Sequence, residues 1–176
     1  MIDLEGFEWT CASTGVRRRG LPDLVFEGPL CFEAADDNPN VKVLEKTDDV
    51  CLAEIHGRHF SYIRCVLPMP IQGAHDHQLN FGVWASLSEV NYGRYVDAFF
   101  DLDQSKLGLM FGYLGNALPG YPNTENLQLT VAPRDNRLRP QVYVQDDHAC
   151  HPLFIDQQRG ISQDKLAEFL ASMDKG

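Results

Sequence analysis

The sequence lacks a long apolar run. None of its uninterrupted hydrophobic stretches approaches the ~20 residues that a helix needs to cross a bilayer. The opening residues, 1–6, also lack the charged, apolar and small-residue regions of a secretory signal peptide. We therefore expect no contact with a membrane and a cytoplasmic location.

The chain is poor in basic side chains. It carries 15 lysines and arginines against 25 aspartates and glutamates, and its formal net charge is −10. An excess of negative charge repels phosphate backbones, which argues against binding to nucleic acid. It favours a basic protein partner instead, for example a toxin that the protein would neutralise. Association with such a partner should slow as the salt concentration rises.

Cysteines are few, and their number is odd. The five are Cys11, Cys31, Cys51, Cys65 and Cys150. The odd count and the wide spacing argue against a disulfide framework and favour reduced thiols. Three of them, Cys31, Cys51 and Cys65, stand in apolar, strand-like segments, so we expect them to be small buried side chains.

The chain shows no internal repeat and no break in composition that would mark a second domain. Its 176 residues, 44% of them hydrophobic, are enough to bury one core, so we expect a single domain over 1–176. Within it, residues 1–23 should form a small N-terminal lobe and residues 24–176 the body.

Alternating and β-branched segments predict most of the secondary structure. We expect strands at 24–26, 30–32, 50–55, 60–66, 79–87, 109–114, 127–131 and 141–145, with turns at 56–59 and 118–122. Pro68 and Pro70 should end the strand that begins at residue 60, because proline cannot donate to a sheet ladder. Residues 73–78 should form a polar loop, and residues 133–139 should link the last two strands.

Two helices are expected among these strands. Ser86 followed by Glu89 resembles a capping box and predicts a helix to about residue 100. Its core-facing residues should be Val90, Val96, Phe99 and Phe100.

Ser162 predicts the start of a C-terminal helix, whose apolar face would carry Leu166, Phe169, Leu170 and Met173. The expected fold class is therefore α+β, with a largely antiparallel sheet or sheets, one inserted helix and a C-terminal helix.

Short motifs in a fixed order carry a resemblance to a known family. They include Gly20-Leu21-Pro22-Asp23, Asp49-Val50-Cys51, Phe81-Gly82-Val83-Trp84, Leu118-Pro119-Gly120-Tyr121-Pro122, Arg139-Pro140 and His151-Pro152-Leu153. Together they resemble the bacterial DUF2199 family, whose function is unknown, from Cys11 to about Leu166. The resemblance implies a shared fold and supplies no activity to carry over.

One departure from that family concerns zinc. Its members tend to begin with C-x-x-C-G-x-x-H, the knuckle of a small zinc ribbon, whereas this chain has Cys11, Thr14, Gly15 and Arg18 at those positions. Structural zinc requires four thiolate or imidazole ligands, and an arginine near the vacant position would repel a cation. We therefore expect that the N-terminal zinc is lost and that no cofactor is bound. The lobe would be held by packing of Phe7, Trp9 and Leu21.

Residues within or beside the family motifs supply a candidate binding set: Asp49, Arg64, Trp84, Tyr121, Arg139 and His151. Two guanidinium groups suit recognition of a carboxylate, and aromatic side chains suit a protein contact. Asp49 precedes a strand, where it would serve as a turn residue or as an acceptor for a ligand. Trp84 lies between apolar neighbours and is expected in the core.

Histidine pairs leave a metal site open as an alternative. His75 with His77, and His148 with His151, have spacings that zinc ligands use, which would suit a metal-dependent hydrolase. The simpler interpretation is two solvent-facing loops. Cys150 stands between His148 and His151 and is the one thiol flanked by imidazoles, although triad partners usually come from distant segments.

Other catalytic signatures are missing, since the chain has neither a G-x-S-x-G elbow nor a G-x-x-x-x-G-K-[ST] loop. The sequence therefore favours a non-enzymatic binding or interaction module for a protein or small molecule. A metal-dependent hydrolase and a binder of small carboxylates, centred on Arg64 and Arg139, remain as alternatives.

Overall fold

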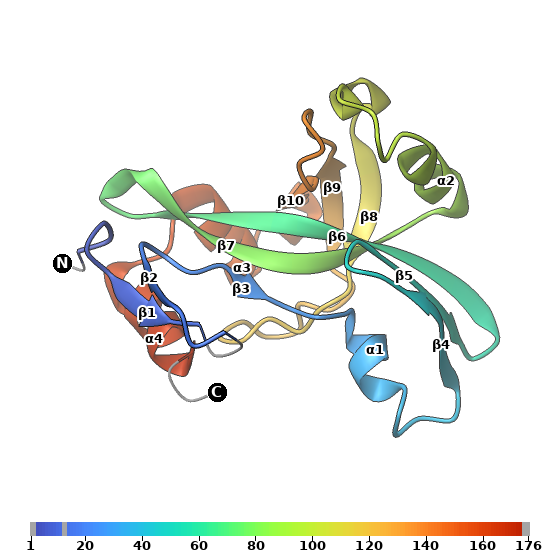
Figure 1. Cartoon of the computed structure of the whole chain (residues 1–176), viewed down its shortest axis with the longest axis horizontal. Coiled ribbons are helices and arrows are strands. Elements are labelled where there is room, and N and C mark those ends of the chain that lie inside the picture. The colour runs from blue at the N-terminus through green and yellow to red at the C-terminus, as the bar shows by residue number, and fades with distance from the viewer. Residues whose placement is uncertain (1–2, 12–13, 174–176) are drawn as a thin grey trace.

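The computed structural model describes residues 3–11 and 14–173 (Figure 1). Its main sheet has eight strands in the order β3–β7–β8–β9–β10–β6–β5–β4, and β6 also pairs with β7. Five strands therefore close into a barrel: β6 (Arg58–Ile71), β7 (Ala74–Leu87), β8 (Met110–Leu114), β9 (Gln128–Ala132) and β10 (Gln141–Val144). Four of the barrel's pairings are antiparallel, and β10 closes it by a parallel pairing of Gln141 with Val66.

Alternation of apolar residues places the core inside this barrel. Val83, Leu114, Leu129, Val131 and Val142 are fully buried and belong to one apolar cluster. On β8, β9 and β10 their neighbours along the strand are more exposed and point outward, which is the period-two pattern that the sequence shows. The strands predicted at 109–114, 127–131 and 141–145 are confirmed, as is the link between the last two.

The hairpin of β6 and β7 is longer than the barrel and carries other elements at both ends (Figure 1). At one end, β6 pairs with β5 (Val50–Ile55), which pairs with β4 (Val41–Lys46), and α1 (Leu30–Ala34) lies beside them. At the other end lie α4 (Gln163–Met173) and the small sheet of β1 (Glu8–Thr10) and β2 (Arg17–Arg19). The short strand β3 (Leu24–Val25) pairs with β7.

Two prolines lie inside β6, so the prediction that they end the strand is wrong. Pro68 lies opposite Asn80 and Pro70 opposite Gln78 of β7. The carbonyl of Pro68 accepts from Gln157 Nε2, and that of Pro70 from the backbone of Ile161, so both point away from β7. The two ring nitrogens therefore lie on the edge of β6 beyond its pairing with β10, where a missing N–H breaks no ladder bond.

Because β6 continues through its prolines, the predicted polar loop at 73–78 is also wrong. Those residues lie in β7, apart from Gly73 in the turn, where φ is +78°. A further difference is α1, since a strand was expected at 30–32. A short apolar run cannot by itself distinguish a strand from a helix, and here Pro29 precedes the first helical residue.

The helix α2 (Glu89–Asp97) begins and ends at other residues than predicted. Ser88, not Ser86, caps it, and the Ser88 hydroxyl accepts from the backbone N–H of Asn91 at 3.2 Å. The helix also ends at Asp97, so Phe99 and Phe100 lie beyond it. Its buried side chain is Tyr95, whereas the predicted core residues Val90, Val96 and Phe100 are exposed; of the predicted set, Phe99 packs against the core.

The C-terminal helix α4 confirms its prediction. The hydroxyl of Ser162 accepts from the backbone of Lys165, and Leu166, Phe169 and Leu170 are buried. The side chain of Met173 lies outside the described residues. A helix that the sequence did not predict, α3 (Pro152–Arg159), packs on β6 and β10. Within the described residues, strands take up more of the chain than the four α-helices do, which agrees with α+β at a coarse level.

In the N-terminal segment, β1 and β2 form a hairpin in which Trp9 pairs with Arg18. Phe7 and Leu21 pack against the main core. Of the aligned zinc-knuckle positions, Cys11, Thr14 and Gly15 are described, whereas the intervening residues 12 and 13 are outside the described ranges. None of the helices within residues 3–11 and 14–173 is long and apolar enough to cross a bilayer.

Candidate functional site

Three of the six predicted binding residues meet where β5 begins. Asp49 precedes β5 and Arg139 precedes β10, and Arg139 Nε donates to Asp49 Oδ1 at 2.8 Å. The backbone carbonyl of Asp49 accepts from the backbone N–H of Arg64 at 2.9 Å. Arg64 Nη1 donates to the backbone carbonyl of Asp48 at 3.2 Å. Two guanidinium groups therefore lie near one carboxylate.

Electrostatics at Arg64 reflect this arrangement. Burial lowers the pKa of the Arg64 guanidinium, and the nearby charge of Arg139 lowers it further. Asp49 and Asp48 oppose that shift. Arginine stays protonated at physiological pH even so, so the cluster retains its positive charge.

Trp84 supports this cluster from the core, as expected. Its side chain is fully buried, and its indole Nε1 donates to the backbone carbonyl of Phe26 at 3.0 Å. The guanidinium carbon of Arg64 lies 5.9 Å from the centre of the Trp84 ring, and Lys46 Nζ lies 4.7 Å from it. These distances are those of cation–π contacts. Trp84 is therefore a platform for two cations and is not exposed to a partner.

Tyr121 and His151 form a separate group on the C-terminal helices. The hydroxyl of Tyr121 donates to Asp156 Oδ2 at 2.8 Å, and Lys165 Nζ lies 2.6 Å from the same oxygen. Burial raises the pKa of the Tyr121 phenol, and the hydrogen bond to Asp156 is the next largest cause of the increase. His151 caps α3 through Nδ1, which accepts from Leu153, and its Nε2 lies 2.6 Å from the carbonyl of residue 122. Both side chains join the turn at 118–122 to α3 and α4.

The structure does not assemble the four histidines of the alternative metal site. His75 and His77 lie on β7, whereas His148 lies in the short 3₁₀ turn η2 (Asp146–His148) and accepts from the backbone of Gln128 through Nε2. Within the described part of the chain, no group of three or more histidine, cysteine, aspartate or glutamate side chains could hold a metal ion. Cys150 is exposed, and its flanking imidazoles bond to backbone groups.

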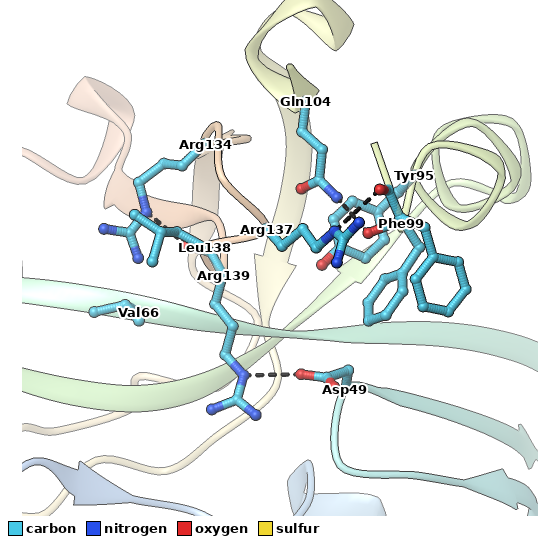
Figure 2. Close-up of a pocket in the computed structure, with 10 residues that line it drawn as sticks. Asp49, Val66, Tyr95, Phe99, Gln104, Arg134, Arg137, Leu138 and Arg139 are labelled. Atoms are coloured by element: carbon cyan, nitrogen blue, oxygen red, sulfur yellow. Dashed lines mark hydrogen bonds and ion pairs between the residues drawn. The ribbon is translucent and has the colours of Figure 1, made fainter. Parts of the chain in front are cut away.

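Asp49 and Arg139 line a pocket of about 480 Å³. Figure 2 shows it between the β6–β7 hairpin, the segment that follows α2 and the loop before β10. We call it the arginine pocket, and its lining residues are Asp49, Val66, Tyr95, Phe99, Phe100, Gln104, Arg134, Arg137, Leu138 and Arg139. Three of them are arginines from one loop.

Each of these arginines is fixed through its Nε atom. Arg134 Nε donates to the backbone carbonyl of Arg139 at 2.7 Å, and Arg137 Nε to that of Phe100 at 3.1 Å. Arg139 Nε donates to Asp49. The terminal Nη atoms of the three donate to no other group among residues 3–11 and 14–173. The pocket therefore presents positioned guanidinium groups with unused donors.

Backbone contacts position the loop that carries the arginines. The backbone N–H of Asn136 donates to the carbonyl of Leu102, and Asp135 Oδ1 accepts from the backbone of Ser105 at 2.9 Å. The hydrogen bonds from Ser105 lower the pKa of Asp135. Asn136 and Arg137 have φ values of +59° and +58°, a backbone conformation that residues other than glycine rarely adopt. Such backbone strain is common at binding sites.

A buried amide forms part of the pocket wall. Gln104 is 2% exposed, and its Nε2 donates to the backbone carbonyls of Ala98 and Phe99 at 3.0 and 2.8 Å. Its Oε1 is buried and has no hydrogen-bond partner within the described residues. An unpartnered buried acceptor is uncommon in proteins.

Sequence reasoning identified Asp49 and Arg139 but missed Arg134, Arg137 and Gln104. One signal was present, since three arginines occur within residues 134–139 of an otherwise acidic chain. Gln104 gave no comparable signal, because its proximity to the loop depends on the folded chain.

A family model described as "Uncharacterized protein conserved in bacteria (DUF2199)" matches residues 10–161. The chain belongs to this family. All six predicted residues and the three loop arginines lie within the segment that matches DUF2199. No curated protein matches the chain, and no solved structure does. DUF2199 membership therefore supports the resemblance seen in the sequence.

Proposed function

We propose that the protein is a non-enzymatic binding module whose arginine pocket takes a small carboxylate ligand with an apolar part. The observation that carries this proposal is the set of three arginines held by Nε around one pocket, with their terminal nitrogens unused. Two parallel N–H groups of a guanidinium match the two oxygens of a carboxylate.

Charge around the pocket supports an anion. Asp49 compensates Arg139, but Arg134 and Arg137 have no acidic partner within 4.0 Å in the described chain. A ligand carboxylate would supply the missing negative charge. Because each arginine is already oriented, its binding would require little further loss of side-chain freedom.

The apolar part of the ligand is suggested by the opposite wall. Phe99 and Phe100 line it, and Phe100 is 75% exposed; Leu138 adds apolar surface on the arginine loop itself. Covering that ring would remove apolar surface from water and add to the affinity. An aryl or alkyl carboxylate is therefore a better fit than a purely polar one.

Arg64 has a different place in this proposal from the one that the sequence suggested. It lines a neighbouring pocket of about 480 Å³ together with Lys46 and Asp48. Its role would be to hold Asp49 through the backbone bond, so the carboxylate site is centred on Arg134, Arg137 and Arg139. A cytoplasmic location is part of the same proposal, and the thiols Cys31, Cys51 and Cys65 are compatible with it.

Thermal unfolding with a matched ligand pair tests the proposal. Phenylacetate should raise the Tm, whereas the neutral amide phenylacetamide should not. A ligand concentration of about 100 times Kd should stabilise the folded protein by about 2.7 kcal/mol. For a chain of this size, that stabilisation should raise the Tm by roughly 5–10 °C.

Two double variants locate the effect. R134Q/R137Q should abolish the phenylacetate shift. R17Q/R19Q removes the same charge from exposed residues of β2 and should keep it. Equal shifts in both variants, or no shift with phenylacetate in the unsubstituted protein, would contradict the proposal.

A further inference from the structure

A second surface lies on the outside of the barrel, on the strands β8, β9 and β10. Thr130 of β9 pairs with Phe111 of β8 on one side and with Tyr143 of β10 on the other. The neighbours of these residues along each strand are buried, so the row points outward. Phe111 and Tyr143 are 42% and 36% exposed.

The sizes of the outward side chains make this surface a groove. Thr130 and Ala132 on the central strand are small, whereas Leu109 beside β8 and Tyr143 on β10 are large. These residues line a depression of about 600 Å³, which continues to Asp146 and Asp147 at the end of β10. We call it the barrel groove. Leu109 is 73% exposed, so the groove presents apolar surface to solvent.

Charge in the barrel groove is of one sign. Asp146 and Asp147 are exposed, and neither forms an ion pair within the described ranges. No lysine or arginine is among the lining residues. By contrast, Asp49 is paired with Arg139 and Asp156 with Lys165. The groove thus combines apolar and aromatic walls with two uncompensated negative charges.

We propose that the barrel groove binds an extended basic segment of a protein partner. Its lysine or arginine side chains would lie beside Asp146 and Asp147 and against the ring of Tyr143, which attracts cations. Its apolar side chains would cover Leu109 and the methyl groups of Thr130 and Ala132. The net charge of −10 would steer such a partner toward the protein. This site is independent of the arginine pocket, where the charge has the opposite sign.

A labelled peptide that alternates arginine and valine is a direct probe, with fluorescence anisotropy at physiological salt as the readout. The unsubstituted protein should bind it and should not bind a peptide in which glutamate replaces arginine. D146N/D147N should weaken binding about tenfold, which is about 1.4 kcal/mol. Tyr143→Ser should also weaken it.

A matched control separates this site from a general effect of charge. D36N/D37N removes two exposed carboxylates between α1 and β4, away from the barrel groove, and should leave the affinity unchanged within about twofold. R134Q/R137Q should likewise bind the peptide normally, which keeps this test apart from that of the carboxylate ligand. The proposal is overturned if D36N/D37N weakens binding as much as D146N/D147N, or if the glutamate peptide binds equally well.

Discussion

Gln157 of α3 provides a measurable test of how the barrel is closed. The side chain is 5% exposed. Its Oε1 accepts from the backbone N–H of Val144 at 2.9 Å, and its Nε2 donates to the carbonyl of Val142 at 2.9 Å and to that of Pro68 at 3.4 Å. It therefore joins β10 to β6 where the two strands no longer pair directly.

Gln157→Leu removes these bonds while nearly preserving side-chain volume. The Val144 N–H and the Val142 carbonyl would lose their Gln157 bonds, at about 1–3 kcal/mol for each buried group left unpaired. Burial of the leucine would recover about 1–2 kcal/mol. We expect a net loss of about 3 kcal/mol in the free energy of unfolding.

Equilibrium unfolding in urea measures this loss. With a slope of about 2–3 kcal/mol per molar urea, the midpoint should fall by about 1–1.5 M. The neighbouring Gln158 is exposed, so Gln158→Leu should change the free energy of unfolding by less than about 0.5 kcal/mol. A Gln157→Leu midpoint equal to that of Gln158→Leu would refute the proposed role of Gln157 in holding β10 to β6.

Further predictions concern stability and thiol chemistry. Gly112→Ala should lower the free energy of unfolding by about 2–3 kcal/mol, because its Cβ would lie 2.6 Å from the carbonyl oxygen of Ser86. In α2, a Cβ at Gly93 would meet open space, so Gly93→Ala should raise the free energy of unfolding by about 0.5–1 kcal/mol. Urea midpoints that move in the same direction in the Gly112→Ala and Gly93→Ala variants would contradict this. Burial raises the pKa of Cys51 to about 11 from 9.0, so its contribution to stability is present below about pH 9 and is lost as pH rises toward 11. Urea midpoints that stay constant over that range would exclude it. Cys150 is exposed and should be alkylated in the native protein, whereas the buried Cys51 should react only after unfolding. Alkylation of Cys51 in the native protein, detected by peptide mapping, would contradict this prediction.

The barrel strands could be predicted from the sequence because one face of each is buried. Residues 127–131 and 141–145 alternate for that reason, and both became strands. The length of β6 could not be predicted, since Pro68 and Pro70 are compatible with a strand only where their nitrogens face an unpaired edge. That depends on which strand lies beside β6, a property of the assembled sheet. The prediction of the α2 cap failed for a similar reason: Ser86 lies within β7, where it pairs with Tyr62 and Tyr113, so the helix begins only after Ser88.

The candidate site was predicted in part. Asp49, Arg64, Trp84 and Arg139 lie around one point, although they come from four separate segments. Local patterns in the sequence gave no information on the contact between the arginine loop and the segment after α2. That contact depends on backbone bonds such as the one from Asn136 to the carbonyl of Leu102, and bonds of this kind have no sequence signature.

The central claim is that the loop arginines bind a carboxylate, and nitrogen–proton correlation spectra of arginine side chains test it most directly. Titration with phenylacetate should shift the Nε–H signals of Arg134, Arg137 and Arg139, with one common Kd. The Nε–H signals of Arg17 and Arg19 should stay in place and serve as internal controls. Signals that shift equally at all of these arginines, or at none of them, would contradict the account.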